Sequence, residues 1–436
     1  MAIASQKTKR PGYKQTEVGV IPEDWNAELM DSVAKRGSGH TPDKQHPEYW
    51  DGDIKWISLK DSDRLDELYI CDTAATITPA GIANSSAIMH AAGTVVLSRD
   101  AGVGKSAIMR DAMAVSQHFM AWLCGPRLDN HFLYYWLQSK KSEFERIAFG
   151  NTIKTIGLPY FKKLKIPLPP LHEQQMVAAA LNAVGALISG LDQLIAKKRD
   201  IKTAAMQQLL TGKRRLPGFG RAKAGFKVKE IGAIPEEWEV KALGELGQFK
   251  NGINKDKEDF GHGFPFVNLL DVFGIPKVSS DIDFGLVNSS TAERKLYELR
   301  KGDVLFVRSS VKPDGVGLST LVQEDLPDTV FSGFLIRYRD SGQLALEYKE
   351  HCFGETGFRG KLIAISTISA NTNINQNALK GLQLAFPTDK REQKAIAAVL
   401  SDMDAYIAAL ESRRDKTRAI KQGMMQQLLT GKIRLV

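Results

Sequence analysis

The chain contains two copies of one sequence plan, and this duplication limits the folds open to it more than any other feature. EVGVIPEDW at Glu17–Trp25 returns as EIGAIPEEW at Glu230–Trp238. A second match ends each half, where 20 of the 41 residues from Glu173 to Lys213 are identical to those from Glu392 to Lys432. Chance does not produce such an ungapped match, so we expect two structural repeats of one design.

Divergence between the copies is confined to their middles, since residues 30–165 and 243–385 share only scattered similarities. A tandem duplication that had drifted evenly would not leave this pattern. We interpret the repeated ends as a shared scaffold and the middles as two different binding domains. The resulting division is a first domain over 1–168, a long helix over 169–215, a second domain over 216–387 and a second long helix over 388–436.

Apolar residues recur at alternating steps of four and three in both repeated ends, the spacing of a helix that packs on another helix. Each helix would span about 60 Å and end at a Thr-Gly pair, where glycine can supply a left-handed cap. The pattern weakens near Lys198 and Thr417, where we expect Ile201 and Ile420 to continue it. The predicted helix–helix contact joins Val177, Leu181, Val184, Ile188 and Leu191 to Ile396, Leu400, Met403, Ile407 and Leu410.

The simplest partner for each long helix is the other copy, in an antiparallel pair with the domains at opposite ends. Packing of each helix on its own domain is the alternative. The domains themselves combine short β-like runs at 54–59, 93–98 and 302–307 with a helical patch at 131–147. The fold class is therefore α/β (α+β): two mixed domains joined by two long antiparallel coiled-coil helices, related by a pseudo-two-fold axis.

The formal net charge of +9 favours an acidic partner such as nucleic acid. The three cysteines are far apart and are expected to be small buried hydrophobes in a reducing compartment. The N-terminus does not look like a signal peptide and no apolar run reaches the length of a membrane span, so we expect a cytoplasmic protein. GVGKS at Gly102–Ser106 lacks the first glycine of a P-loop, since Arg99 stands there. We expect no catalytic, cofactor or metal site.

Over its full length the chain resembles the specificity subunits of type I restriction–modification systems. The resemblance rests on IPEDW and IPEEW, on HTPDKQHPEYWDGDIKWISLKD at His40–Asp61, on GTVVLSRDAGVGKSAI, on KIPLPPLHEQ at Lys165–Gln174, and on QQLLTGK at both helix ends. The second half departs from the pattern, with GINKDKEDFGHGFPFVNLLD and FPTDKREQ in the matching places.

The resemblance implies two target recognition domains that each read half of a split site on double-stranded DNA, with the helices fixing the gap. It also implies two adenine-N6 methyltransferase subunits as partners, together with restriction subunits. These partners, and not this chain, would hold S-adenosylmethionine, ATP and Mg²⁺. One heptad inserted into one helix should change the gap, about 10 bp between half-site centres, and leave the half-sites unchanged.

Base-reading residues vary within such a family, so the candidate DNA contacts are chosen from loops. Arg and Lys suit guanine or phosphate, and Asn suits adenine, although all are also common in turns. The candidates are Lys60, Arg99, Lys105 and Lys154 in the first domain and Asn268, Arg308, Lys312 and Asn373 in the second. Three alternatives stay open: a standalone DNA-binding regulator, a DNA-modifying enzyme with an unrecognised active site, and a coiled-coil adaptor.

Overall fold

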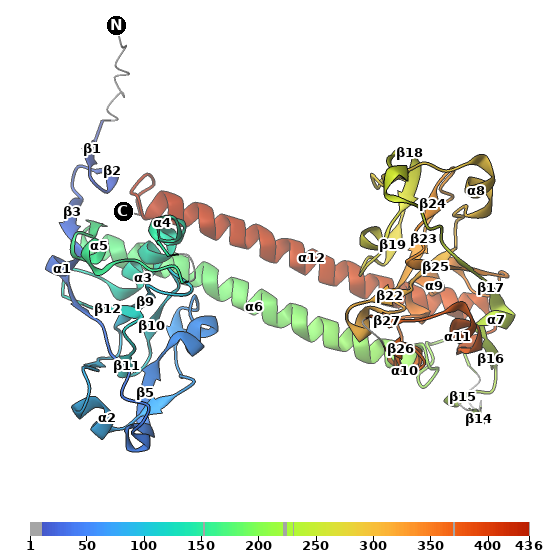
Figure 1. The fold of residues 1–436 in the computed structure, drawn as a ribbon, viewed down its shortest axis with the longest axis horizontal. Helices are drawn as coiled ribbons and strands as arrows, with labels where there is room; N and C mark the ends of the chain where they lie inside the picture. Colours follow the sequence, from blue (N-terminus) through green and yellow to red (C-terminus); the bar gives the residue numbers. More distant parts are fainter. Residues whose placement is uncertain (1–10, 151–152, 221–224, 230, 369–370, 436) are drawn as a thin grey trace, which may run out of the picture. The chain divides into compact units, whose positions relative to one another are not determined.

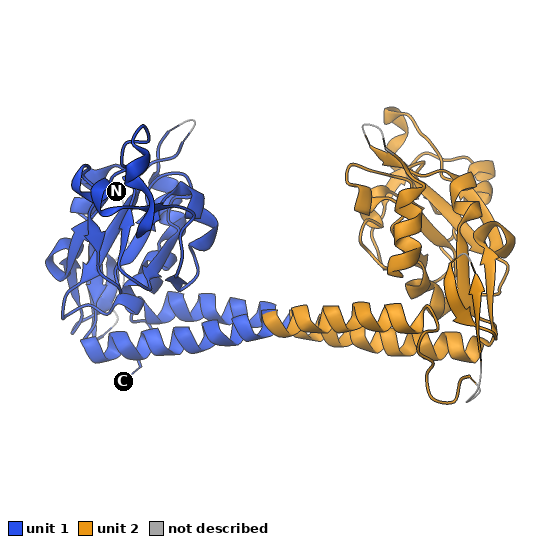
Figure 2. Ribbon diagram, turned by 90° about the horizontal axis from the view of Figure 1, so that it is seen from below, with its two compact units in different colours: residues 1–192, 412–436 blue, residues 193–411 orange. Residues whose placement is uncertain are grey.

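The computed structural model describes residues 11–150, 153–220, 225–229, 231–368 and 371–435. It divides into two compact units, coloured in Figure 2. Unit 1 consists of residues 1–192 with 412–436, and unit 2 of residues 193–411. Both boundaries fall inside a long helix, so each unit contains one domain and a part of both helices.

The two long helices are α6 (Leu171–Leu209) and α12 (Lys390–Leu428), which lie side by side in Figures 1 and 2. Each is 39 residues long. Gly212 and Gly431 follow their ends with φ angles of +70° and +66°. Both glycines therefore adopt the left-handed conformation predicted for a C-cap.

Contacts inside each unit make the helices antiparallel. In unit 1, Asp192 accepts hydrogen bonds from Arg414 and Arg418, at 3.5 and 2.9 Å. In unit 2, the Lys198 ammonium lies 4.9 Å from the centroid of the Tyr406 ring, and Lys202 and Arg199 form ion pairs with Asp404 and Glu411. Partner numbers fall along α12 as they rise along α6, which is the predicted direction.

Most of the predicted helix–helix positions are buried: Val177, Leu181, Leu191, Ile396, Leu400, Ile407 and Leu410. Val184, Ile188 and Met403 are half-buried. The expectation for Ile201 and Ile420 is wrong, because both are exposed whereas Thr417 is buried. The polar residues near Lys198 and Thr417 remain on the contact face because Lys202 forms an ion pair with Asp404 there.

The helices also pack on the domains, so the alternative packing is present as well. Val177 and Leu181 of α6 join the core of the first domain, together with Leu428 and Leu429 at the end of α12. By length and composition alone, α6 could cross a membrane. Within the described structure, 22% of its apolar 18-residue stretch is buried.

The first domain contains two sheets. Its five-stranded sheet has the order β4 (Ala34–Gly37), β12 (Phe119–Cys124), β9 (Val95–Ser98), β10 (Ser106–Met109), β6 (Tyr69–Ile70). Its four-stranded sheet has the order β7 (Thr76–Ile77), β5 (Trp50–Ile57), β11 (Met113–Val115), β8 (Met89–His90). Two further pairs are β1 (Tyr13–Thr16) with β2 (Gly19–Pro22), and β3 (Asn26–Leu29) with β13 (Lys165–Leu168).

The second domain repeats the five-stranded sheet and the two strand pairs, and differs in its other sheets. Its five-stranded sheet has the order β17 (Gly247–Asn251), β25 (Leu335–Asp340), β21 (Val304–Val307), β23 (Ser319–Val322), β19 (Lys277–Val278). Two three-stranded sheets have the orders β20 (Gly285–Val287), β18 (Phe260–Val267), β24 (Val330–Phe331), and β22 (Ser309–Ser310), β27 (Thr372–Asn373), β26 (Thr367–Ile368). Two pairs are β14 (Phe226–Lys229) with β15 (Gly232–Pro235), and β16 (Trp238–Ala242) with β28 (Gln383–Pro387).

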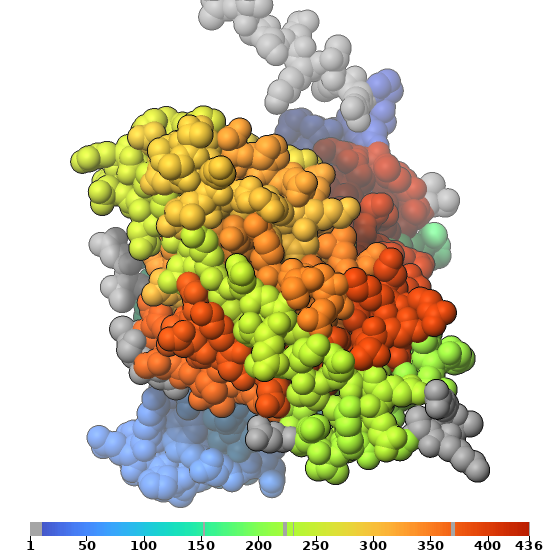
Figure 3. All heavy atoms as spheres, turned by 90° about the vertical axis from the view of Figure 1, so that its right-hand side faces the viewer, coloured from blue at the N-terminus to red at the C-terminus, as the bar shows by residue number. Residues whose placement is uncertain are grey.

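Short helices cover these sheets. In the first domain they are α1 (Met30–Val33), η1 (Pro47–Tyr49), η2 (Leu59–Arg64), α2 (Pro79–Ala83), α3 (Asn130–Ser139), α4 (Lys141–Ile147) and α5 (Leu158–Lys162). In the second they are α7 (Leu243–Leu246), η3 (Lys257–Asp259), η4 (Leu269–Asp271), α8 (Thr291–Leu296), η5 (Pro313–Gly315), α9 (Leu346–Cys352), α10 (Thr356–Ala364) and α11 (Gln376–Gly381). Figure 3 shows yellow-green and orange-red segments, far apart in the sequence, sharing one surface of this domain.

Each domain is closed by the end of the helix from the other half of the sequence. Arg434 forms an ion pair with Glu173 and Asp24, at 2.7 and 2.8 Å, and its guanidinium lies over Trp25. We call this contact the tail salt bridge of unit 1. The tail salt bridge of unit 2 joins Arg215 to Glu392 and Glu237, at 2.7 and 3.3 Å. The repeated motifs of the sequence are therefore the parts that lock each domain to the helix pair.

The cysteine prediction holds only in part. Cys352 is buried, and burial raises the pKa of the half-buried Cys124 thiol to about 12. Cys71 is exposed, because it follows the edge strand β6, so the expectation that it is a buried hydrophobe is wrong.

Candidate nucleic-acid interface

In the first domain, strand ends from both sheets meet at one edge. Strands β5 and β11 are parallel, and the Ser116 amide after β11 donates to the Ile57 carbonyl at 2.9 Å. A turn then leads into β12, where the His118 carbonyl accepts from the Arg99 amide at 3.0 Å. The loop after β5, which forms η2, and the loop after β9 therefore begin at the same edge.

A third loop joins these two. The Arg99 carbonyl accepts from the Ile156 amide at 2.9 Å, and the Lys154 carbonyl accepts from the Ala101 amide at 3.3 Å. The Lys105 ammonium donates to the Ser62 carbonyl in η2 at 3.0 Å. The structure thus brings together the loops that carry all four predicted residues of the first domain.

The four side chains differ in how free they are. Lys60 and Lys154 are exposed, and the described residues offer their ammonium groups no hydrogen-bond or ion-pair partner. Arg99 is mostly covered and lies 3.4 Å from Asp100. Lys105 is half-buried and also lies 3.8 Å from Asp63. Lys60 and Lys154 are the better placed to meet a phosphate.

A hollow of about 360 Å³ lies between the loops, lined by Lys105, Lys141 and Lys154 with Gly102, Val103 and Glu145. Loop-based reasoning missed Lys141, because it begins α4 and not a loop. Lys141 forms an ion pair with Asp66, and Lys105 lies 3.8 Å from Asp63. Among the described residues Lys154 is therefore the lysine of this hollow that remains free to bind an anion.

The second domain builds the same edge from the equivalent strands. The Ser332 amide after β24 donates to the Val267 carbonyl at the end of β18, at 2.9 Å. The Arg308 amide donates to the Phe334 carbonyl at 2.8 Å. The Arg308 carbonyl accepts from the Ile374 amide at 2.9 Å, as the Arg99 carbonyl does from Ile156 in the first domain.

All four predicted residues of the second domain lie on these loops. Strands β22 and β27 pair Ser309 with Asn373 directly, which joins the Arg308–Lys312 loop to the amide-rich stretch. The Lys312 side chain is exposed, and the described residues give it no partner. Arg308 donates to the Gly333 carbonyl at 3.3 Å. Asn373 donates to the Asn371 carbonyl at 2.9 Å.

Asn268 has a structural task that the sequence did not reveal. Its side-chain oxygen accepts from the Leu269 amide at 2.7 Å, and the Asp271 carboxylate accepts from the Asn268 amide at 2.7 Å. This reciprocal cap begins η4. Ser58 and Asp61 form the same capping box at η2. Only the NH₂ group of the Asn268 side chain remains for a base.

Arg359 on α10 is a residue that sequence reasoning missed. Its guanidinium donates to the Val316 and Asp314 carbonyls, both at 2.7 Å. Burial lowers its pKa from the ordinary value. The contact fixes the loop after β22, so Arg359 positions Val311 and Lys312 from behind. Its distance of 47 residues along the chain from Lys312 left no local pattern to find.

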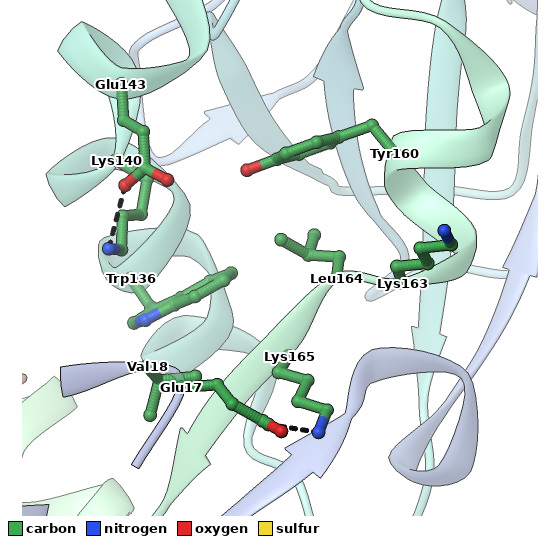
Figure 4. Close-up of a pocket in the computed structure, with 9 residues that line it drawn as sticks. All are labelled: Glu17, Val18, Trp136, Lys140, Glu143, Tyr160, Lys163, Leu164 and Lys165. Atoms are coloured by element: carbon green, nitrogen blue, oxygen red, sulfur yellow. Dashed lines mark hydrogen bonds and ion pairs between the residues drawn. The ribbon is translucent and has the colours of Figure 1, made fainter. Parts of the chain in front are cut away.

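A second hollow of the first domain, about 350 Å³, is less suited to DNA (Figure 4). Two of its lysines are already paired, Lys140 with Glu143 at 2.9 Å and Lys165 with Glu17. The apolar part of its lining is formed by Trp136, Tyr160 and Leu164. Lys163 is the third lysine of this hollow, which lies outside the three edge loops.

Comparisons with known proteins agree with the duplicated architecture. A sequence model of the type I restriction modification DNA specificity domain matches residues 22–197 and again residues 235–418. The type I restriction enzyme MjaIX specificity subunit of Methanocaldococcus jannaschii is 28% identical over 62% of this chain and 63% of its own length. The MjaVIII specificity subunit of the same organism is 24% identical over 100% of this chain and 99% of its own.

Solved structures share the fold. A chain from a study of complex assembly and conformational transition of the type I R-M system has a TM-score of 0.61 at 17% identity. The match covers 95% of this chain and 99% of that chain. At this identity the likeness establishes the architecture, two mixed α/β domains with a long helix after each.

Proposed function

The chain belongs to the family of type I restriction–modification specificity subunits, and from this premise we propose that the edge loops of each domain read one half of a split DNA site. It is a DNA-recognition subunit with two target recognition domains. One observation carries the proposal: both domains bring the same three loops to the same strand ends, but with different side chains. A shared frame with different contacts is what reading two different half-sites requires.

We further propose that this chain catalyses nothing. Two adenine-N6 methyltransferase subunits would dock on it and use S-adenosylmethionine, and restriction subunits would use ATP and Mg²⁺. The long helices would set the distance between the half-sites, and the complex would work in the cytoplasm. The relatives' names as restriction enzyme specificity subunits support this division of labour. The family match also disfavours the regulator, enzyme and adaptor alternatives.

The test is long-read detection of N6-methyladenine in cells that express the chain with its methyltransferase, compared with cells that express the methyltransferase alone. We expect a split motif that appears only when the chain is present. If the complex assembles and no such motif appears, the proposed function is wrong, and a standalone regulator or a coiled-coil adaptor becomes the better explanation.

Variants test whether the edge loops of each domain contact DNA. Lys154→Ala should weaken binding through the first domain and Lys312→Ala through the second, each reducing the slope of log affinity against log salt by about one. Lys163→Ala is the control, since this exposed lysine lines the hollow of Figure 4, outside the three edge loops. An equal slope change in the control would show that the loops have no special role.

A further inference from the structure

Apolar side chains stand exposed on the candidate interface of the second domain. Leu270 at η4 is 84% exposed, Val311 after β22 is 82% exposed and Phe334 before β25 is 56% exposed. All three belong to the segments that meet at the strand ends described above. Large exposed apolar side chains gathered on one functional edge mark a surface that a partner covers.

The first domain carries polar side chains at two of these three places, although it exposes Phe149 and Ile153, at 66% and 53%, on the loop of Lys154. Ser58 caps η2 and Asn268 caps the equivalent helix η4. Leu270, two residues after its cap, therefore occupies the position of Lys60 in the first domain. Phe334 occupies the position that His118 has in the first domain. The carbonyl of each accepts a hydrogen bond from the amide of the arginine after the central strand, Arg308 or Arg99. His118 is in turn bound to Asp100 at 2.7 Å. The two domains therefore offer different chemistry on one frame.

The apolar loop of the second domain is held in place. Arg359 binds the carbonyls of Asp314 and Val316. A Cβ on Gly315 would lie 2.8 Å from the Phe273 ring, so that ring packs directly on the loop backbone. Val311 and Leu270 are thus presented on ordered backbone, which reduces the entropy lost on binding.

DNA is the occupant that the charges favour. Lys312 is adjacent to Val311 in the sequence and exposed, and Arg308 begins the same loop. In the major groove, the one apolar group that a base pair offers is the thymine C5-methyl. We propose that Leu270 and Val311 contact thymine methyl groups in the half-site read by the second domain. This inference rests on the proposed function and names the chemistry of one of its two readers.

The test uses the chain in complex with its methyltransferase and duplexes that carry the split motif. Each thymine of the second half-site is replaced by uracil, which removes only the methyl group. We expect binding to weaken about fourfold at one or two positions, the value of one buried methyl group. Uracil in the first half-site serves as the DNA control, because substitutions in the second domain should leave its effect unchanged.

Protein variants connect the effect to the residues. Leu270→Ser and Val311→Ser should each abolish the uracil effect at one position, whereas Val228→Ser, equally exposed at 84% on β14, should leave it intact. At such exposure a serine leaves the fold unchanged, which a melting curve checks.

Several outcomes would overturn the inference. Insensitivity to uracil in the wild type is one, and uracil sensitivity that persists in both variants is another. If Leu270→Ser weakens methyltransferase assembly without altering the uracil effect, the apolar edge is a protein contact. A wild-type complex that marks no split motif would refute the proposed function itself.

Discussion

His90 on β8 is tightly enclosed in the first domain. A Cβ on Gly37 would lie 2.5 Å from its ring, and its Nε2 lies 3.3 Å from the Ser38 carbonyl oxygen. Burial lowers the pKa of His90 below its ordinary value, and Lys35 adds to the effect. The unfolded chain therefore binds a proton at a higher pH than the folded chain does.

This difference predicts acid sensitivity. Above the pKa of His90 in the unfolded chain, about 6.5, the free energy of unfolding should be fully retained. It should decline as the pH falls toward the lower pKa of the folded chain. Between pH 7.5 and pH 5, the melting temperature should fall further for the wild type than for His90→Gln. The difference should be about 2–4 °C for each kcal/mol of stability that protonation of His90 removes. The exposed His262→Gln is the control, and a smaller fall in that variant as well would refute the assignment.

Residues near the site could be predicted only where local sequence decides their place. Lys154 and Lys312 follow turn signals, so their loops were identifiable. The capping task of Asn268 and the clamp formed by Arg359 depend on contacts with the folded backbone, and no spacing reports them. Lys141 was missed because it approaches the hollow from a helix.

At the scale of elements, the helix pair departs from its own symmetry at one position. Lys202 and Lys421 are equivalent in the repeat, but Lys202 faces Asp404 whereas Lys421 faces Gly185. Lys421 lies 5.2 Å from the Tyr135 ring centroid, and burial lowers its pKa. Unit 1 thus lacks, at this place, the carboxylate that unit 2 has.

Gly185→Asp should restore that carboxylate. We expect the variant to stabilise unit 1 by about 1 kcal/mol, from an ion pair with Lys421 and from the replacement of a helical glycine. Gly190→Asp is the control, because a Cβ there meets nothing within 4 Å and only the glycine effect remains. Chemical denaturation measures both, and an equal gain in a Lys421→Met background would exclude the ion pair.

The tail salt bridges should contribute strongly to stability. Arg434→Ala leaves the buried Glu173 without its cation, so we expect a loss of about 2–4 kcal/mol, near the lower end for a broken buried pair because Arg434 is 26% exposed. Arg391→Ala, which breaks the surface pair with Asp389, should cost less than about 1 kcal/mol. Denaturation curves showing equal costs would mean that Glu173 finds another partner.

Heptad spacing predicted both helices and most of the buried positions, and the duplication predicted their antiparallel direction. It was wrong for Ile201 and Ile420 because hydrophobicity alone assigned the contact face where the helices are polar. An ion pair keeps Lys202 on that face and leaves the isoleucines exposed. Side-chain pairing across two helices is information that one helix's pattern does not contain.

At the scale of the whole molecule, the duplication predicted two domains of one design, and their five-stranded sheets agree strand for strand. The predicted antiparallel pair also implied the exchange of helix ends, in which residues 412–435 complete the unit that begins the chain; it did not predict the tail salt bridges that hold them there. Nothing in a repeat states which partners the tail arginines bind.

Adding length to the helices tests the proposed spacing role. One heptad inserted after Asp192 and another after Glu411 would leave the contacts within each unit intact and lengthen the pair by about 10 Å. At about 3.4 Å per base pair, we expect the gap in the methylated motif to grow by about 3 bp with unchanged half-sites. Mapping of N6-methyladenine measures both the gap and the half-site sequences. A changed half-site with a constant gap would refute the spacing role.

The exchange of helix ends also sets an order of events during synthesis. Unit 2 is one continuous stretch and can close as soon as Glu411 has left the ribosome, whereas unit 1 must wait for Leu428, Leu429 and Arg434. At 5–20 residues per second, the intervening segment of about 220 residues takes roughly 10–40 s to make. During that time the nascent first domain exposes Val177 and Leu181. The domain that is made first is therefore finished last.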